Sequence, residues 1–170
     1  AVGTTGSMNA LLICIAMGLS NGAGVIISQC FGAQRYGEMK KAVTAMMYVA
    51  SVTGLVITAA GIFLAGPAMR LLGVPDSIIH LSVLYMRIVF GFSLTGIFYN
   101  AFAAILRSAG DSRTPLYMLI ISSVINVVLD LLFVLKFGMG VAGVAYATVI
   151  AQGVSAALCA MYIIKHRYQL

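Results

Sequence analysis

The residue with the clearest capacity for chemistry is Asp130, which lies inside the apolar stretch SSVINVVLDLLFVLKFG, residues 122–138. It precedes Lys136 by six residues, which places it roughly 9 Å below the end of a helix. An ionised aspartate near the middle of a bilayer costs about 2.5–3.5 kcal/mol, so the carboxylate must face a bundle interior or a hydrated cavity. Asn126 lies one helical turn earlier on the same face, and we expect its amide to donate a hydrogen bond to Asp130.

Two kinds of ion chemistry suit a carboxylate in this position. Burial favours the neutral form of a carboxyl group, so a partly hydrated aspartate can exchange a proton. The same carboxylate, with amide and hydroxyl oxygens nearby, can instead hold Na⁺, a hard cation. The structural alternative is a carboxylate that only bridges neighbouring helices. Because ionisable groups inside a membrane are functional by default, we favour ion coupling at Asp130.

Five further polar side chains lie within apolar runs of the sequence. Thr148 and Gln152 are one helical turn apart and share a face. Asn21 and Gln29 are two turns apart in the first run, and Asn100 lies in a third run. Each one alone is more often a hydrogen-bonding group between helices than a ligand. Together with the aspartate, they predict a mostly apolar cavity with a few polar groups.

Arg87 borders an uncharged run, and we expect its side chain to snorkel to the membrane interface. The alternative is an ion pair with Asp130. The cysteines and histidines show no spacing typical of metal ligands, so we predict no metal site beyond Na⁺ at Asp130, and no other cofactor. These residues are Cys14, Cys30, Cys159, His80 and His166.

The composition identifies an integral membrane protein. The 170 residues are 62% hydrophobic and 8% charged, against roughly 25% charged residues in soluble domains. Four runs contain no charged residue, and each reaches or nearly reaches the length of about 20 residues that a membrane-spanning helix needs. They cover residues 1–34, 42–69, 88–106 and 137–164. The net charge of +6 is explained by basic loops rather than by nucleic-acid binding, because no long basic run is present.

Breaks in the pattern predict an all-α bundle of five membrane-spanning helices. A proline, Pro67, is expected to stop the second helix, and Thr114 with Pro115 is expected to begin the fourth. The predicted spans are residues 5–31, 39–66, 77–108, 115–137 and 141–165.

The basic residues predict how these spans are oriented. Seven cations fall on one side of the membrane if every span crosses: Arg35, Lys40, Lys41, Arg107, Arg113, Lys165 and Arg167. The other side has only Arg70 and Lys136. Positive loops are cytoplasmic, so we expect the N-terminus of the chain outside and its C-terminus inside. An outside start, and a beginning without methionine, predict a further helix before residue 1.

Small residues recur at helical spacing on two of the predicted helices. Gly18 and Gly22 form a GxxxG pattern, which favours close helix packing. A second stripe repeats every fourth residue near the end of the chain. Its members are Gly143, Ala147, Ala151, Ser155 and Cys159.

Two stretches resemble a known family. AAILRSAGDSRTPLYM, residues 103–118, is similar to the loop between the fourth and fifth helices of the multidrug and toxic compound extrusion (MATE) transporters. GLSNGAGVIISQCFGAQRYGE, residues 18–38, resembles the end of their second helix and the loop that follows. With the Asn-x-x-x-Asp pattern in the next helix, the likeness covers essentially the whole chain.

The resemblance implies that the chain is helices two to six of a six-helix amino-terminal lobe in a twelve-helix transporter. Such proteins exchange H⁺ or Na⁺ for cationic, often aromatic drugs by alternating access. By resemblance, Asp130, Asn126 and Thr148 belong to the cation and proton site. Asn100, Gln152 and Tyr85 match positions that face the drug cavity in some members. The first helix, with its acidic partner, and the carboxyl-terminal lobe are missing, so we expect an inner (plasma) membrane fragment that is inactive alone.

Three other functions compete with this interpretation. A flippase for lipid-linked precursors would need a cationic cavity, and only Arg87 is available for one. A structural membrane subunit without transport activity would be favoured if Asp130 were paired with Arg87 and sealed from water. An intramembrane enzyme ranks last, because the spans contain no Ser/His pair, paired aspartates or histidine cluster.

Overall fold

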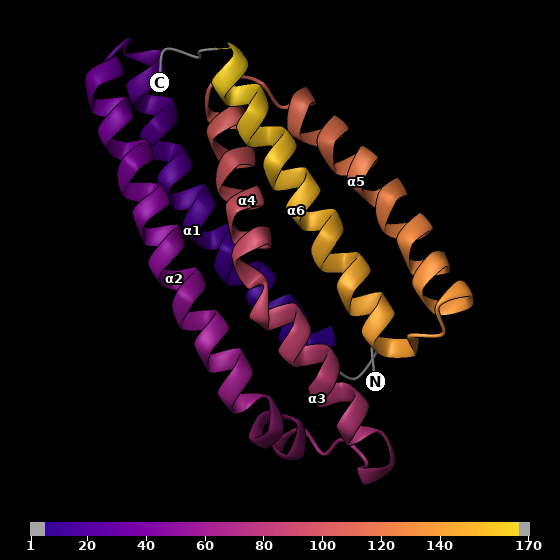
Figure 1. Cartoon of the computed structure of the whole chain (residues 1–170). Helices are drawn as coiled ribbons and strands as arrows, with labels where there is room; N and C mark the ends of the chain where they lie inside the picture. The colour runs from indigo at the N-terminus through magenta and orange to yellow at the C-terminus, as the bar shows by residue number, and fades with distance from the viewer. Residues whose placement is uncertain (1–5, 167–170) are drawn as a thin grey trace.

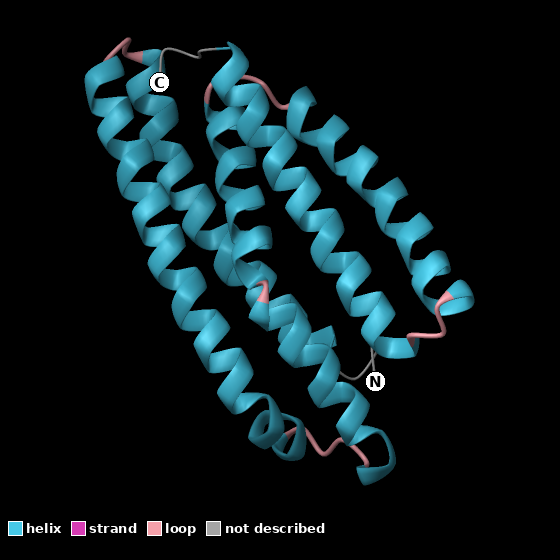
Figure 2. Cartoon of the chain, in the orientation of Figure 1, coloured by secondary structure: helices cyan, strands magenta, loops and turns pink. Residues whose placement is uncertain are grey.

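A computed structural model describes residues 6–166, apart from the side chains of residues 7–9, and contains only helices, turns and loops in that part of the chain (Figures 1 and 2). The expected all-α bundle is therefore confirmed. In chain order the elements are α1 (Gly6–Gly32), α2 (Tyr36–Leu71), α3 (Asp76–Gly91), α4 (Ser93–Ser108), α5 (Arg113–Leu131), the π-helical segment η1 (Leu132–Lys136) and α6 (Gly140–His166).

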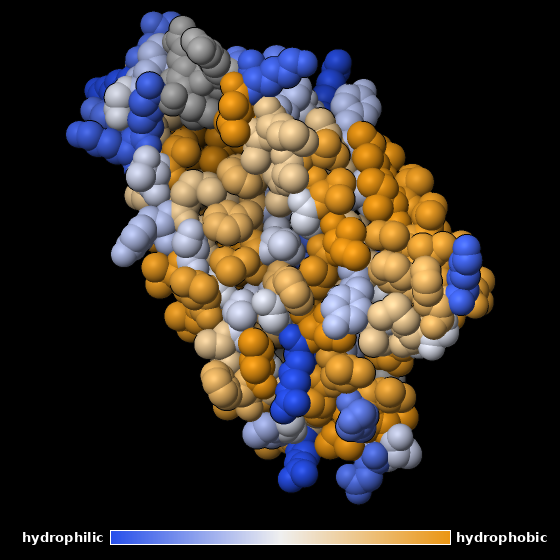
Figure 3. All heavy atoms as spheres, in the orientation of Figure 1, coloured by the Kyte–Doolittle hydropathy of each residue, from blue (hydrophilic) through white to orange (hydrophobic). Residues whose placement is uncertain are grey.

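Four helical segments of the described chain are long and apolar enough to cross a membrane. These are residues 10–32 of α1, the whole of α2, α5 with η1, and α6. The pair α3 and α4 passes the same test as one span bent by 45°. Figure 3 shows a mainly apolar band across the middle of the molecule and hydrophilic residues gathered at its two ends. This distribution fits a bundle that crosses a bilayer.

The expectation that α2 stops at Pro67 is wrong, because the helix continues to Leu71. Proline removes one backbone hydrogen bond, to the carbonyl of Phe63, and normally kinks or ends a helix. Here Ala65 and Met69, on either side of the proline, are 1% and 0% exposed and belong to the same apolar core cluster. Packing on both sides of Pro67 keeps α2 helical although one backbone hydrogen bond is missing.

The predicted single helix over 77–108 is also wrong, because it is divided at Phe92. Gly91 precedes the break, and a glycine weakens a helix interior by about 1 kcal/mol. The hydroxyl of Thr95 donates to the carbonyl oxygen of Phe92 at 2.8 Å, and the Ser93 and Thr58 hydroxyls are 3.1 Å apart. These contacts satisfy polar groups at the bend and join it to α2.

α5 begins two residues earlier than expected, and Thr114 is not its capping residue. The backbone N–H of Thr114 instead donates to Oδ1 of Asp111 at 3.0 Å. A carboxylate three residues ahead is the usual acceptor for a free N–H in the first helical turn. Asp111 therefore fixes the start of the helix that carries Asn126 and Asp130.

α6 lies at the centre of the half of the bundle that carries Asp130, in contact with α3, α4 and α5 (Figure 1). The predicted small-residue stripe of α6 is buried along its length, and Ala147 and Cys159 are both 0% exposed. Small side chains at these positions let the neighbouring helices approach closely. The stripe therefore sets the distance between α6 and the helices that carry the other polar residues.

The expected packing role of Gly18 and Gly22 is not seen, because both are exposed and have nothing within 4 Å of an added Cβ. α1 packs through a different face, on which Ala16, Ser20 and Ile27 are buried. That face meets α2 and α4.

Gly61 of α2 provides a test of this packing, because a Cβ added there would collide with the side chain of Phe90 in α3. Overpacking of this kind costs about 1–3 kcal/mol. We expect Gly61→Ala to lower the thermal unfolding temperature of the purified protein in detergent. Gly37→Ala, in the open first turn of the same helix, is the control and should leave that temperature unchanged or raise it slightly. Equal unfolding temperatures for the two variants would contradict the proposed contact.

Candidate functional site: a polar pocket beside Asp130

A pocket of about 330 Å³ lies between α4, α5 and α6. It brings together four of the residues predicted from the sequence: Asn100, Asn126, Thr148 and Gln152. Four further polar side chains complete its lining, namely Tyr99, Ser122, Ser123 and Ser155. The remaining lining is Ile13, Gly96, Leu119 and Ala151. The predicted combination of apolar walls with a few polar groups is therefore present at this position.

The absence of a side chain at Gly96 creates room for one of these polar groups. A Cβ added to Gly96 would lie 2.9 Å from Oε1 of Gln152. The Gln152 amide of α6 consequently rests directly on the backbone of α4. The main-chain carbonyl of the same glycine accepts a hydrogen bond from Nδ2 of Asn100 at 2.8 Å. Gly96 thus positions polar groups from two helices at one wall of the pocket.

Two hydroxyl groups of the pocket, those of Thr148 and Ser122, use their hydrogens within their own helices. Thr148 donates to the carbonyl of Val144 at 2.9 Å, and Ser122 donates to the carbonyl of Leu119 at 3.0 Å. A hydroxyl that has donated its hydrogen still has lone pairs with which to accept a bond. The Thr148 and Ser122 oxygens are therefore available to a cation or to a hydrogen-bond donor.

Asp130 lies one turn beyond Asn126 on α5, roughly 6 Å along the helix. Its Oδ1 atom and Nδ2 of Asn126 are both buried and have no hydrogen-bond partner. The hydrogen bond that we predicted between these side chains is therefore absent. An unsatisfied buried polar group costs about 1–3 kcal/mol, and more when it is charged. A buried polar atom without a partner requires an explanation, and one explanation is that the atom binds a ligand or an ion.

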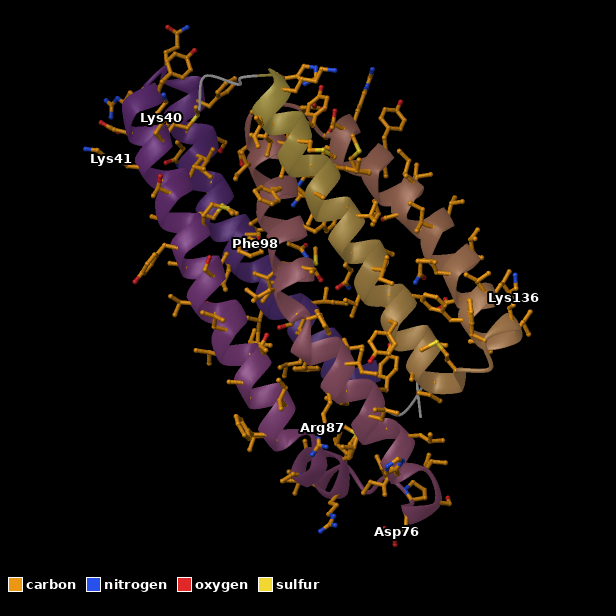
Figure 4. The ribbon with its side chains drawn as sticks, viewed as in Figure 1. Lys40, Lys41, Asp76, Arg87, Phe98 and Lys136 are labelled. Carbon is orange, nitrogen blue, oxygen red and sulfur yellow. The ribbon has the colours of Figure 1, made fainter. Side chains whose placement is uncertain are left out.

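The surroundings of Asp130 provide an electrostatic neighbour but no counter-ion. Tyr85 of α3 lies within electrostatic range of the carboxylate, and its side chain is 5% exposed within the apolar core that α3 forms with α6. Tyr85 does not line the pocket. Arg87 is exposed (Figure 4) and forms no ion pair with Asp130. An ion pair does form at the surface, between Arg35 and Glu38 at 3.6 Å, and it involves neither Arg87 nor Asp130.

Two of the predicted residues lie elsewhere. Asn21 lines a separate hollow of about 320 Å³ between α1 and α4, together with Ser28 and Arg107. Gln29 is exposed and lines neither hollow. Both side chains belong to α1, which does not contact α5. Asn21 and Gln29 are two turns apart on α1, but this spacing does not bring either side chain to the site of Asp130.

The sequence contained a signal for two of the four polar lining residues that we did not predict. Ser122 precedes Asn126 by one turn, and Ser155 follows Gln152 by three residues. Each extends an identified polar face along its helix. Ser155 was assigned only to the packing stripe, and it serves both purposes, since it is 1% exposed and lines the pocket.

Within the described part of the chain, no three His, Cys, Asp or Glu side chains gather in a way that could hold a metal ion. A monovalent cation needs fewer charged ligands. Here the buried carboxylate oxygen belongs to the residue one helical turn beyond Asn126, which lines the pocket together with the Thr148 and Ser122 hydroxyls. These groups fit either a proton on Asp130 or a Na⁺ ion held by Asp130 and neighbouring oxygens.

The fold and the pocket define a polytopic helical membrane protein with a polar site inside its bundle. The family model described as MatE matches residues 1–132, and the chain belongs to that family. This result confirms the resemblance found in the sequence.

Comparisons with individual proteins agree with the family assignment. The chain is 34% identical over 164 residues to the probable multidrug resistance protein YoeA of Bacillus subtilis, covering 94% of this chain and 35% of that protein. It is 39% identical over 153 residues to the probable multidrug resistance protein YpnP of the same organism, covering 89% and 34%. A crystal structure of MATE in the bent conformation superposes with a TM-score of 0.94 at 25% identity, covering 98% of this chain and 37% of that one. The chain therefore spans about a third of the length of the curated relatives.

The pocket predicts which positions water-soluble reagents reach. In a variant without the three native cysteines, we expect Gln152→Cys to react with a charged thiol reagent. Ile97→Cys should be protected, because Ile97 lies on α4 beside the pocket wall but is 1% exposed. The measurement is the labelled fraction in membrane vesicles. Protection of Gln152→Cys would show that the pocket is closed to water, and equal labelling of both positions would show that access is not confined to the pocket.

Proposed function

We propose that this chain is part of a secondary active multidrug exporter, which uses H⁺ or Na⁺ to extrude cationic amphiphilic compounds. The observation that carries the proposal is the buried, unpartnered Oδ1 of Asp130 beside a pocket rich in acceptor oxygens. An uncompensated carboxylate inside an apolar bundle is stabilised when it binds a proton or a cation. The similarity to two probable multidrug resistance proteins supports drugs as the transported class.

Ion binding and release at Asp130 provide the coupling. With an ion bound, the site is neutral and its helices can pack in an apolar environment. After the ion leaves, the exposed charge favours a conformation that gives it water or a cationic substrate. Such exchange requires two conformations with different affinities for the ion, and a second lobe must move against this one to produce them. We place the chain as helices two to six of the amino-terminal lobe.

The basic residues support a cytoplasmic location for the end of the bundle where α1, α4 and α6 terminate. Six of the seven cations assigned to that side lie in the described chain; Arg167 lies outside it. The opposite end carries Arg70, Arg87 and Lys136. This asymmetry follows the positive-inside rule and puts the beginning of α1 at the outer face of the cell membrane.

Neither alternative function has comparable support. A flippase for anionic lipid-linked precursors needs basic groups in its cavity, and the described residues that line the pocket include no Lys, Arg or His. An ion pair between Asp130 and Arg87 would have favoured a purely structural subunit. Arg87 is instead exposed and unpaired with Asp130.

Replacing Asp130 by Asn tests the proposed coupling. In the full-length protein, we expect Asp130→Asn to abolish efflux of a fluorescent cation such as ethidium from vesicles under an imposed H⁺ or Na⁺ gradient. The unfolding temperature should stay the same or rise, because the variant removes a buried charge without changing the shape of the side chain.

The control is Asp76→Asn, at the exposed start of α3, which should retain efflux. Imposing the two gradients separately identifies the coupling ion. Normal efflux by Asp130→Asn would overturn the role of this carboxylate. Loss of efflux together with a large loss of stability would instead assign it a structural role.

A further inference from the structure

A second pair of hollows lies on the outer surface of α1 and α2, away from the polar pocket. The first is a groove of about 360 Å³ whose lining is apolar except for Ser20. It follows α2 from Ala42 to Ala50, roughly 12 Å along the helix axis, and includes the exposed side chains of Ile26 and Val49. We call it the α1–α2 groove.

The second hollow continues the groove toward the end of the bundle. It is lined by Lys40, Lys41, Thr44, Ala45 and Tyr48, all on α2. Ala45 lines both hollows, so they meet at that residue. The two lysines come directly before the uncharged run 42–69, which places them where the helix leaves the hydrocarbon layer. Figure 4 shows both at the upper end of α2, on the side of the bundle away from α5.

The lysines carry uncompensated charge. Glu38 is paired with Arg35 at 3.6 Å, and neither lysine forms an ion pair with any residue that the structure describes. Tyr48 is 72% exposed and lies about 10 Å deeper than Lys41 along the helix. At this depth the Tyr48 ring lies within the hydrocarbon layer, beside the upper part of an acyl chain. The surface therefore changes from cationic to amphipathic to apolar as it enters the membrane.

We propose that this surface binds an anionic phospholipid, with its headgroup phosphate on Lys40 and Lys41 and one acyl chain in the α1–α2 groove. The order of the groups along α2 matches the order of charge and apolarity along such a lipid. A soluble anion would use the lysines but not the groove. A neutral lipid would use the groove but not the lysines.

The lysines, rather than the groove, must provide the selectivity. Lipid chains in the bilayer are as apolar as the groove, so an acyl chain gains little hydrophobic free energy by entering it. A basic residue near an anionic membrane surface contributes about 1 kcal/mol. Two lysines therefore correspond to a preference of about 25-fold for an anionic over a zwitterionic lipid.

Native mass spectrometry of the full-length protein tests the site, with dioleoylphosphatidylglycerol and dioleoylphosphatidylcholine as the two probes. We expect the first to bind more tightly by about 25-fold, and the double variant Lys40→Gln with Lys41→Gln to remove that preference. Ala45→Leu should lower binding of the anionic lipid without changing any charge, because it fills the junction of the two hollows. Glycerol phosphate, which has the headgroup charge but no acyl chain, should not compete.

The matched control is the double variant Arg113→Gln with Lys165→Gln, which removes two exposed charges from the same end of the bundle on α5 and α6. It should retain the preference. An equal loss in the control would mean that the whole basic surface attracts lipid, and full binding by Ala45→Leu would mean that the groove holds no chain. Absence of any preference in the unaltered protein would mean that another segment covers the groove. Each of these three results would overturn the proposal.

Discussion

The central constraint on this structure is a carboxylate oxygen that is buried in an apolar bundle without a partner. Oδ1 of Asp130 accepts no hydrogen bond, and Nδ2 of Asn126, one turn away, donates none. Each such atom opposes folding, so the bundle must offset the cost through close packing elsewhere. The small-residue stripe of α6 and the glycines of α2 provide that packing, since they let neighbouring helices approach closely. Closely packed helices therefore surround two polar atoms that lack hydrogen-bond partners.

The packing of the same helices supports the proposal that the site binds a cation. α4, α5 and α6 each contribute polar groups, and the hydrogens of Thr148, Ser122 and Asn100 are directed to carbonyl groups of their own helices. The oxygens thus remain available beside a carboxylate that has no counter-ion. Arg87 was the one cation predicted to compete for Asp130, and its exposed position on α3 leaves the carboxylate free. The proposed binding of a small cation or a proton would then rest on charge and acceptor oxygens, without a cluster of acidic ligands.

Much of this arrangement could be predicted from the sequence, because a bilayer makes apolar length and charge position informative. The spans and the α6 stripe follow from apolar length and helical periodicity, whereas the grouping of Asn126 with Thr148 was implied by the family resemblance. Tertiary packing overrode local signals at Pro67, where α2 continues, and at Phe92, where a predicted single helix bends. Periodicity also could not show that Gly18 and Gly22 face away from the described helices, or that Asn21 and Gln29 lie apart from Asp130. Those outcomes depend on which face of α1 meets its neighbours, and several of its faces are apolar.

The central claim is that Asp130 binds the coupling ion. Infrared difference spectroscopy of the full-length protein in lipid, with ¹³C-labelled aspartate carboxyl groups, tests this claim most directly. The account predicts that adding the coupling ion or a cationic drug changes an aspartate carboxyl band, and that the change disappears in Asp130→Asn. An identical difference spectrum in the unaltered protein and in Asp130→Asn would contradict it.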